Sequence, residues 1–322
     1  MEEKKAFKIV ITITPNSNFD EIQNVVKEKV DEFRYFFRVN GSHSQLKWLS
    51  NLPGPILENL IFDFPYRKLR IGAFEGKRVK CGEVFYFSEK KKEGSVPVAG
   101  LSLLCKDVLR GSILVVDDGY LEFIIRDVFE DRLLVESLSE GFLEKGMGVW
   151  VKSIKVYGDI FDHELFQNVR KLGISRFMIS YVDSSSFLDK IFNRKELFLI
   201  AKIEDTLGYE NLNEIMENFD AICVARGDLG ANMEFPDWIE ASFDVVKRSK
   251  LAGKSVFLAG ETFVSSIYRD GKISRSEISD FYNFLNSGID GVILSDETVF
   301  GKNIDGLLNS IKKLVTLWKA KR

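Results

Sequence analysis

A lysine and two carboxylates follow two apolar runs in the middle of the chain. Lys202 and Glu204 come at the end of the run that starts at Leu197, and Asp228 follows the run Ala221–Ala225. Side chains two residues apart on a strand share a face. Carboxylate oxygens suit Mg²⁺ or Mn²⁺, and a neighbouring lysine can neutralise the charge on a phosphoryl group in transfer. An ion pair that closes the end of a core is the alternative interpretation.

The segment between these residues predicts how they come together. Residues 208–218 carry apolar side chains at helical spacing, so the segment is expected to be strand, helix, strand. Two strands joined by one helix in so few residues must be parallel neighbours, because an antiparallel pair would need only a tight turn. Glu204 and Asp228 should therefore leave the same end of one sheet, on strands about 4.8 Å apart. Ligands bind at this end of parallel α/β folds.

Two motifs in this segment resemble the pyruvate kinase family. The fifth barrel strand of that family ends in Lys-Ile-Glu-Asn, and residues 202–205 are Lys-Ile-Glu-Asp. The sixth ends in Ala-Arg-Gly-Asp-Leu-Gly, which residues 225–230 match unaltered. The resemblance implies that Lys202 is catalytic and that Mg²⁺ or Mn²⁺ is held by Glu204 and Asp228. It also implies that phosphoenolpyruvate binds at Arg226, Gly227 and Asp228.

Further residues are assigned through the same resemblance. Residues 38–43, Arg-Val-Asn-Gly-Ser-His, match the family's Arg-Leu-Asn-Phe-Ser-His in four of six positions. This implies that Arg38 is catalytic and holds the phosphoryl group, for which its fork of donors is suited. It also implies a potassium ion held by Asn40, Ser42 and Asp63, and nucleotide contacts from Arg70, Lys145 and His43. Without the resemblance, residues 38–44 would be interpreted as a polar loop before a helix.

The wider pattern predicts the fold. Apolar strands begin near residues 8, 35, 59, 176, 197, 221, 255 and 291, the fourth of them spanning 176–182, and helical stretches lie between most of them, the first over residues 19–33. After the third strand, short apolar runs are joined by hairpin turns at Asp117-Asp118-Gly119 and Glu130-Asp131. We expect an α/β (β/α)₈ TIM barrel of residues 1–67 and 153–322, with residues 68–152 inserted as a small β-barrel lid. The resemblance covers this barrel and lid, and we expect the family's C-terminal effector domain to be lacking.

The chain departs from the family at three positions near the expected site. A gapless alignment puts Gly260 where the family has the threonine that helps deliver a proton to the enolate. Thr262 would share that face if the strand extends so far, and losing such an aid costs about 10²–10⁴-fold in rate. Residues 180–183 are Ser-Tyr-Val-Asp where family members often have Ser-Phe-(Val/Ile)-Arg, so Asp183 replaces an arginine, and Phe64 replaces a threonine.

Composition excludes several classes of function. Lys and Arg number 45 against 48 Asp and Glu in 322 residues, which argues against a nucleic-acid or membrane-surface protein. No apolar run is long enough to span a bilayer, and the N-terminal segment is unlike a signal peptide. Three cysteines without metal-ligand spacing suggest reduced thiols. We therefore expect a cytoplasmic protein, with a homodimer through the barrel helices as one arrangement left open.

The resemblance implies a phosphotransferase that moves the phosphoryl group of phosphoenolpyruvate to ADP, giving pyruvate and ATP. Two alternatives remain at this stage. The departures at Gly260, Asp183 and Phe64 motivate a catalytically degenerate paralogue that acts as a ligand-binding or sensor protein. A site that stabilises an enolate would also suit a metal-dependent lyase or aldolase acting on pyruvate enolate, since fold alone does not determine function.

Overall fold

The computed structural model describes residues 6–20, 22, 31–41, 46–66, 69–117, 119–151, 161–186, 188, 194–260, 262–295 and 303–321. A closed barrel of parallel strands forms its larger part, and each strand pairs with its neighbours in chain order. The strands are β1 (Phe7–Thr12), β2 (Phe33–Asn40), β3 (Leu60–Phe64), β13 (Arg176–Ile179), β14 (Phe198–Ile203), β15 (Ala221–Ala225), β16 (Ser255–Ala259) and β17 (Gly291–Leu294). The expected eight-stranded barrel is confirmed.

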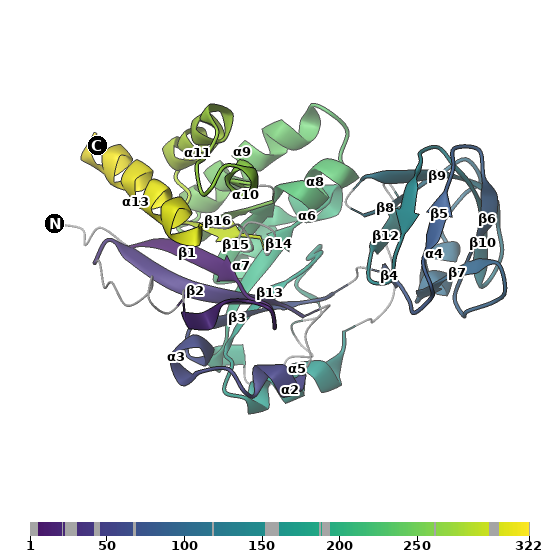
Figure 1. The fold of residues 1–322 in the computed structure, drawn as a ribbon, viewed down its shortest axis with the longest axis horizontal. Coiled ribbons are helices and arrows are strands. Elements are labelled where there is room, and N and C mark those ends of the chain that lie inside the picture. The colour runs from purple at the N-terminus through teal and green to yellow at the C-terminus, as the bar shows by residue number, and fades with distance from the viewer. Residues whose placement is uncertain are drawn as a thin grey trace.

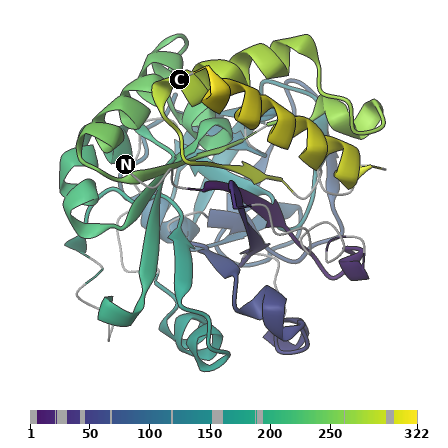
Figure 2. The ribbon, with the colours of Figure 1, turned by 90° about the vertical axis from the view of Figure 1, so that its left-hand side faces the viewer.

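Helices surround these strands (Figure 2). They are α2 (Leu46–Leu49), α3 (Gly54–Leu57), α5 (His163–Lys171), the 3₁₀ helix η2 (Arg194–Glu196), α6 (Thr206–Glu210), α7 (Leu212–Asn218), α8 (Arg226–Asn232), α9 (Asp237–Leu251), α10 (Ser265–Tyr268), α11 (Arg275–Ser287) and α13 (Ile304–Ala320). The helix expected over 208–218 is divided into α6 and α7, because the chain bends at Asn211. Most of the helix expected over 19–33 lies outside the described residues. Within the described part, every helix is too short or too polar to cross a bilayer.

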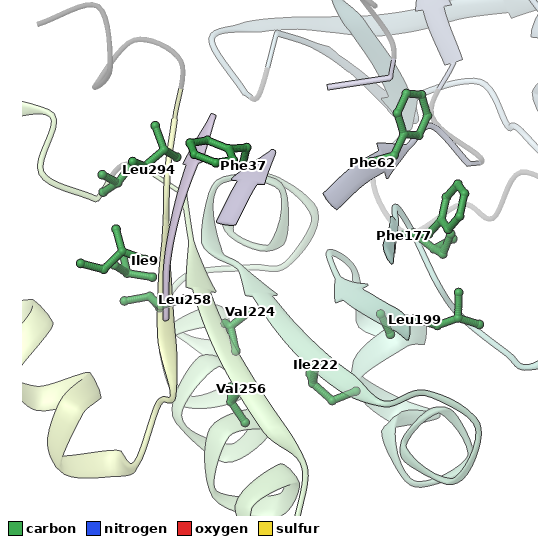
Figure 3. Close-up of a cluster of buried hydrophobic side chains, with 14 of the residues drawn as sticks. Ile9, Phe37, Phe62, Phe177, Leu199, Ile222, Val224, Val256, Leu258 and Leu294 are labelled. Carbon is green, nitrogen blue, oxygen red and sulfur yellow. The ribbon is translucent and has the colours of Figure 1, made fainter. Parts of the chain in front are cut away.

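Side-chain alternation along the strands separates two apolar layers. Outward side chains pack against the helices and form the larger cluster, part of which Figure 3 shows; among them are Ile9, Phe37, Phe62, Leu199, Ile222 and Leu258. Inward side chains fill the barrel, and they include Val10, Ile61, Met178, Ile200, Cys223, Phe257 and Ile293. Each fully buried large side chain stabilises the fold by about 1.5–3 kcal/mol. Polar residues that continue this inward alternation reach the carboxyl end of the barrel.

The segment between β3 and β13 contains the inserted lid, beside the barrel in Figure 1. Its elements are β4 (Leu69–Ile71), β5 (Lys77–Val79), β6 (Val84–Ser88), β7 (Ser95–Ala99), α4 (Leu101–Cys105), β8 (Ile113–Val116), β9 (Leu121–Val128), β10 (Arg132–Ser137), β11 (Gly141–Leu143) and β12 (Gly148–Val151). Seven strands close into a second barrel, while β5 pairs with β11. The expected hairpins are the antiparallel pairs β8–β9 and β9–β10. The boundaries at 67/68 and 152/153 fall outside the described residues and stay a prediction.

Candidate active site

Inward-facing polar side chains gather at the carboxyl ends of four neighbouring strands. Arg38 lies near the end of β2, Asp63 near the end of β3 and Lys202 near the end of β14. Ser180 directly follows β13, and Glu204 directly follows β14. Each belongs to the same alternation as the apolar residues inside the barrel, such as Ile61 and Ile200. Strand periodicity and parallel pairing therefore bring these groups to one mouth of the barrel.

Asp63 is the centre of one half of this cluster. Its Oδ2 accepts from Arg38 Nε at 2.8 Å, and lies 2.7 Å from Arg38 Nη2 and 3.4 Å from Lys202 Nζ. Its Oδ1 accepts from Ser180 Oγ at 3.3 Å. Burial alone would raise the pKa of Asp63, but Lys202 and Arg38 outweigh it and hold the pKa below its ordinary value. Asp63 therefore stays ionised and orients both cationic side chains.

Lys202 joins this half to the second carboxylate. Its Nζ lies 2.8 Å from Glu204 Oε1 and donates to Ser180 Oγ at 3.2 Å. Burial alone would lower the pKa of Lys202, but attraction to Asp63, Glu204 and Asp228 raises it above its ordinary value. Lys202 is therefore a persistent cation, and its side chain keeps 12% exposure with which to meet an anion.

Tyr181 links Glu204 to Asp228, which lies in the first turn of α8. Its backbone N–H donates to Glu204 Oε2 at 2.6 Å, and its hydroxyl donates to Asp228 Oδ1 at 3.0 Å. Burial, followed by the charges of Asp228 and Glu204, raises the pKa of Tyr181 well above its ordinary value. Asn232 Nδ2 donates to the carbonyl oxygens of Asp228 at 2.9 Å and of Glu204 at 3.2 Å. Glu204 and Asp228 thus share Tyr181 as a donor to their carboxylates and Asn232 as a donor to their backbone carbonyls.

These two carboxylates fit a hard divalent cation. Oxygen ligands suit Mg²⁺ or Mn²⁺, and Mg²⁺ in proteins is commonly held by one or two carboxylates with water and substrate oxygens. Within the part of the chain that the structure describes, no group of three or more His, Cys, Asp or Glu side chains forms a metal site. A metal bound by Glu204 and Asp228 would therefore complete its coordination with water, substrate oxygens or other protein oxygens.

Local packing explains why Tyr181 reaches both carboxylates. The expected strand over 176–182 ends at Ile179, because Tyr181 adopts a positive φ of 50° that a strand cannot continue. A Cβ at Gly208 would lie 2.8 Å from Val182 O, so glycine lets α6 approach this loop closely. Asp205 begins α6 by accepting from Gly208 N at 2.7 Å. The aspartate that replaces the family's asparagine therefore serves as a helix cap.

Arg226, expected at the substrate, has its guanidinium group engaged elsewhere. Nη1 donates to Asp280 Oδ2 at 2.6 Å, and Nη2 donates to Gly260 O at 2.9 Å. Its Cζ lies 5.1 Å from the centre of the Phe284 ring. Asp280 and Phe284 belong to α11, so Arg226 joins α8 to α11 in this structure. A part in substrate binding stays a prediction.

The end of β16 differs from what the sequence predicted. The strand ends at Ala259, and Gly260 has a φ of 88°. The condition under which Thr262 would share the strand face is therefore not met, since the strand ends at Ala259. Its hydroxyl donates to Gly260 O at 3.1 Å and accepts from Arg226 Nη2 at 3.2 Å. A Cβ added at Gly260 would lie 2.6 Å from Gly227 N, so this position has no room for a larger residue.

The remaining predicted residues belong to the lid or to the sequence from Asn40 to His43. In the lid, Arg70 Nη1 donates to Gly146 O at 2.7 Å, which brings Arg70 to the turn that carries the exposed Lys145. Asn40 is opposite Asp63 in the β2–β3 register. Ser42 and His43 lie outside the described residues. The nucleotide and potassium roles of these residues stay predictions.

Sequence reasoning missed Tyr181 and Asn232. The signal for Tyr181 was present, because the family often has phenylalanine at this position and tyrosine adds a hydroxyl. The signal for Asn232 was its place four residues after Asp228, which puts both on one face of a helix. Neither signal shows by itself what the added polar group will contact.

Comparison with known proteins agrees with this geometry. The family model for the barrel domain of pyruvate kinase matches residues 4–304. A pyruvate kinase of Thermococcus litoralis is 28% identical over 319 residues, which cover 92% of this chain and 66% of that protein. One of Naumovozyma castellii is 30% identical over 318 residues (91% and 63%), and one of Thermoplasma acidophilum is 26% identical over 308 (92% and 55%). The chain thus spans about half to two thirds of the length of these relatives.

Proposed function

Because this chain belongs to the pyruvate kinase family, we propose that it transfers the phosphoryl group of phosphoenolpyruvate to ADP, giving pyruvate and ATP. The observation that carries the proposal is the cluster at the barrel mouth. Lys202 lies 2.8 Å from Glu204 Oε1, Arg38 pairs with Asp63, and Tyr181 connects Glu204 to Asp228. Two cations beside two oxygen ligands are the groups that phosphoryl transfer needs.

The chain's own residues would bind and orient the transferred group. Arg38 offers a fork of donors to the phosphoryl oxygens, and Lys202 offers a persistent positive charge. Asp63 holds both side chains in place before substrate arrives. Glu204 and Asp228 would hold Mg²⁺ or Mn²⁺, which supplies charge neutralisation for the phosphoryl and enolate oxygens when bound. Preorganised charge of this kind stabilises the transition state without reorganisation cost.

The remaining assignments follow the family. The carboxylate of phosphoenolpyruvate would bind the backbone amides of Gly227 and Asp228. A Cβ at Gly227 would meet no described atom within 4 Å, which supports room for a ligand there. A potassium ion would bind beside Asn40 and Asp63, with Ser42. ADP would lie toward the lid, where Arg70 and Lys145 are its proposed contacts, and His43 is the third residue that the resemblance assigns to the nucleotide.

The reaction balances with a proton from solvent. The bond between phosphorus and the enolate oxygen breaks, a bond to a terminal β-phosphate oxygen of ADP forms, and the enolate carbon takes up a proton to give pyruvate. Gly260 cannot relay that proton, and the Thr262 hydroxyl is engaged with Gly260 O and Arg226. This observation favours a second candidate function, in which the site binds phosphoenolpyruvate and metal without turnover.

A coupled assay for pyruvate tests the proposal, with phosphoenolpyruvate, ADP, Mg²⁺ and K⁺. We expect Lys202→Ala to lower the rate at least about 10²-fold, as for the loss of one preorganised charged donor. Lys250→Ala is the matched control, because Lys250 likewise forms an ion pair, at 2.6 Å from Asp290. No pyruvate from folded wild-type protein would refute phosphotransfer. Calorimetric binding of phosphoenolpyruvate in that protein would then support the second candidate.

A further inference from the structure

We propose that Tyr181 is a positioning residue of the metal centre, whose hydroxyl and backbone amide hold Asp228 and Glu204 in the arrangement that accepts a divalent cation. The inference deepens the proposed function, because it depends on these two carboxylates being the metal ligands. Tyr181 itself contacts neither a phosphoryl group nor a reacting atom in this proposal. Its effect is exerted through the two carboxylates.

Tyr181 is placed for this role by its backbone. The residue follows β13 by two positions and adopts a φ of 50°, a conformation that is uncommon for a bulky residue. Its N–H donates to Glu204 Oε2 at 2.6 Å while its ring extends to Asp228, where the hydroxyl donates to Oδ1 at 3.0 Å. Strained conformations of this kind persist when the surrounding structure holds them, and they cluster at functional sites.

A hydrogen bond to one oxygen of a carboxylate restricts the rotation of the whole group. Tyr181 contacts Oε2 of Glu204 and Oδ1 of Asp228, which defines the planes of both carboxylates before any ion arrives. Donors of this kind commonly orient metal ligands, and their loss typically weakens metal binding by about 10–100-fold. Two like-charged carboxylates brought together without such donors would also repel each other.

Asn232 and Asp228 together determine the direction of the phenol proton, because the first donates to the hydroxyl oxygen and the second can only accept. Asn232 Nδ2 donates to the Tyr181 hydroxyl oxygen at 3.3 Å and to the Asp228 carbonyl at 2.9 Å. Because the hydroxyl accepts from Asn232, its own hydrogen is left to point at Asp228. A phenylalanine, which family members often have at this position, could donate the backbone N–H to Glu204 and could not make the contact to Asp228. Replacing Tyr181 by phenylalanine therefore removes the contact to Asp228 and leaves the contact to Glu204 in place.

The test compares Mn²⁺ affinity in the full chain, without substrates, by electron paramagnetic resonance of free Mn²⁺. We expect Tyr181→Phe to raise the Mn²⁺ dissociation constant about 10–100-fold. Tyr209→Phe is the matched control, because the Tyr209 hydroxyl donates to Asp244 Oδ2 at 3.1 Å and neither residue belongs to the metal centre. It should leave the dissociation constant unchanged. Circular dichroism establishes that both variants are folded.

Different outcomes bear on the inference and on the proposed function. Equal Mn²⁺ affinities in wild type and Tyr181→Phe would overturn the role of Tyr181 and leave the metal centre standing. Wild-type protein that binds no Mn²⁺, or whose binding is unaffected by Asp228→Asn, would overturn the metal centre and the inference with it. Weakened binding in Tyr181→Phe together with no pyruvate formation by wild type would support the inference and refute phosphotransfer.

Discussion

Replacing Gly260 by threonine restores the residue type that the pyruvate kinase family uses here, and we nevertheless expect it to destabilise this chain. Gly260 has a φ of 88°, where a β-branched residue is strained by about 1–2 kcal/mol. The new Cβ would lie 2.6 Å from Gly227 N and 3.1 Å from Arg226 N, both backbone atoms that cannot rotate away. Overpacking of this kind costs about 1–3 kcal/mol. The expected loss in free energy of unfolding is therefore about 2–5 kcal/mol.

Urea denaturation of Gly260→Thr and Gly253→Thr measures the backbone strain and the overpacking separately. Gly253 also has a positive φ, 72°, but a Cβ there would meet no described atom within 4 Å. Gly253→Thr should therefore lower the free energy of unfolding only by the backbone strain, about 1–2 kcal/mol.

The coupled assay for pyruvate tests the effect of Gly260→Thr on activity. Because the added Cβ would press on the Gly227 amide, phosphoenolpyruvate binding should weaken and pyruvate formation should not increase.

Two results would refute this reasoning. The first is a Gly260→Thr variant as stable as Gly253→Thr, which would mean that the contact with Gly227 is relieved at no cost. The second is a Gly260→Thr variant that forms pyruvate faster than wild type, which would mean that the hydroxyl relays a proton from a position that this geometry closes to it.

Two further predictions concern the elements around the site. The Glu277 carboxylate accepts a hydrogen bond from Ser274 in the capping box of α11. Burial alone would raise the pKa of Glu277, but its hydrogen bonds outweigh burial and hold the pKa below its ordinary value. A carboxylate whose pKa is lowered on folding stabilises the fold at pH values above its unfolded-state pKa. The difference in free energy of unfolding between wild type and Glu277→Gln, measured in urea titrations, should therefore be largest near neutral pH and disappear as pH falls below about 4.5. A difference that stays constant with pH would contradict this. Gly208→Ala should lower the free energy of unfolding by about 1–3 kcal/mol, because its Cβ would lie 2.8 Å from Val182 O. Gly54→Ala should leave the free energy of unfolding unchanged, because the added carbon would meet no described atom within 4 Å. Equal stability of the Gly208→Ala and Gly54→Ala variants would show that α6 moves away from Val182 at no cost.

Part of the site followed directly from local rules. The period of two along a strand predicted that Lys202 and Glu204 share a face, and their charged atoms lie 2.8 Å apart. The strand, helix, strand order predicted that Asp228 leaves the same end of the sheet, and β14 and β15 pair in parallel. Both predictions succeeded because side-chain alternation and chain direction are properties of short segments.

The errors lie where a strand ends. Apolar patterning extended the strand at 176 through Val182, but Tyr181 turns the chain with a positive φ. Thr262 would share a face of the seventh strand only if that strand extended so far, and the strand ends at Ala259. Tyrosine and valine favour strands, so residue type gave no warning at the first position. The sign of a single φ depends on the close contacts around it, which apolar periodicity does not describe.

The sequence by itself determined the order of the eight barrel strands, the inserted β lid and the residue types at the mouth, because periodicity and motifs depend on neighbours along the chain. Only the tertiary structure decided which partner each charged group takes. Asp63 lies between Arg38 and Lys202, and Arg226 pairs with Asp280 on α11. Arg38 and Asp63 are 25 positions apart, and Arg226 and Asp280 are 54 apart. At such separations the contact depends on how strands and helices pack in space, and a long side chain can turn to either side of its backbone.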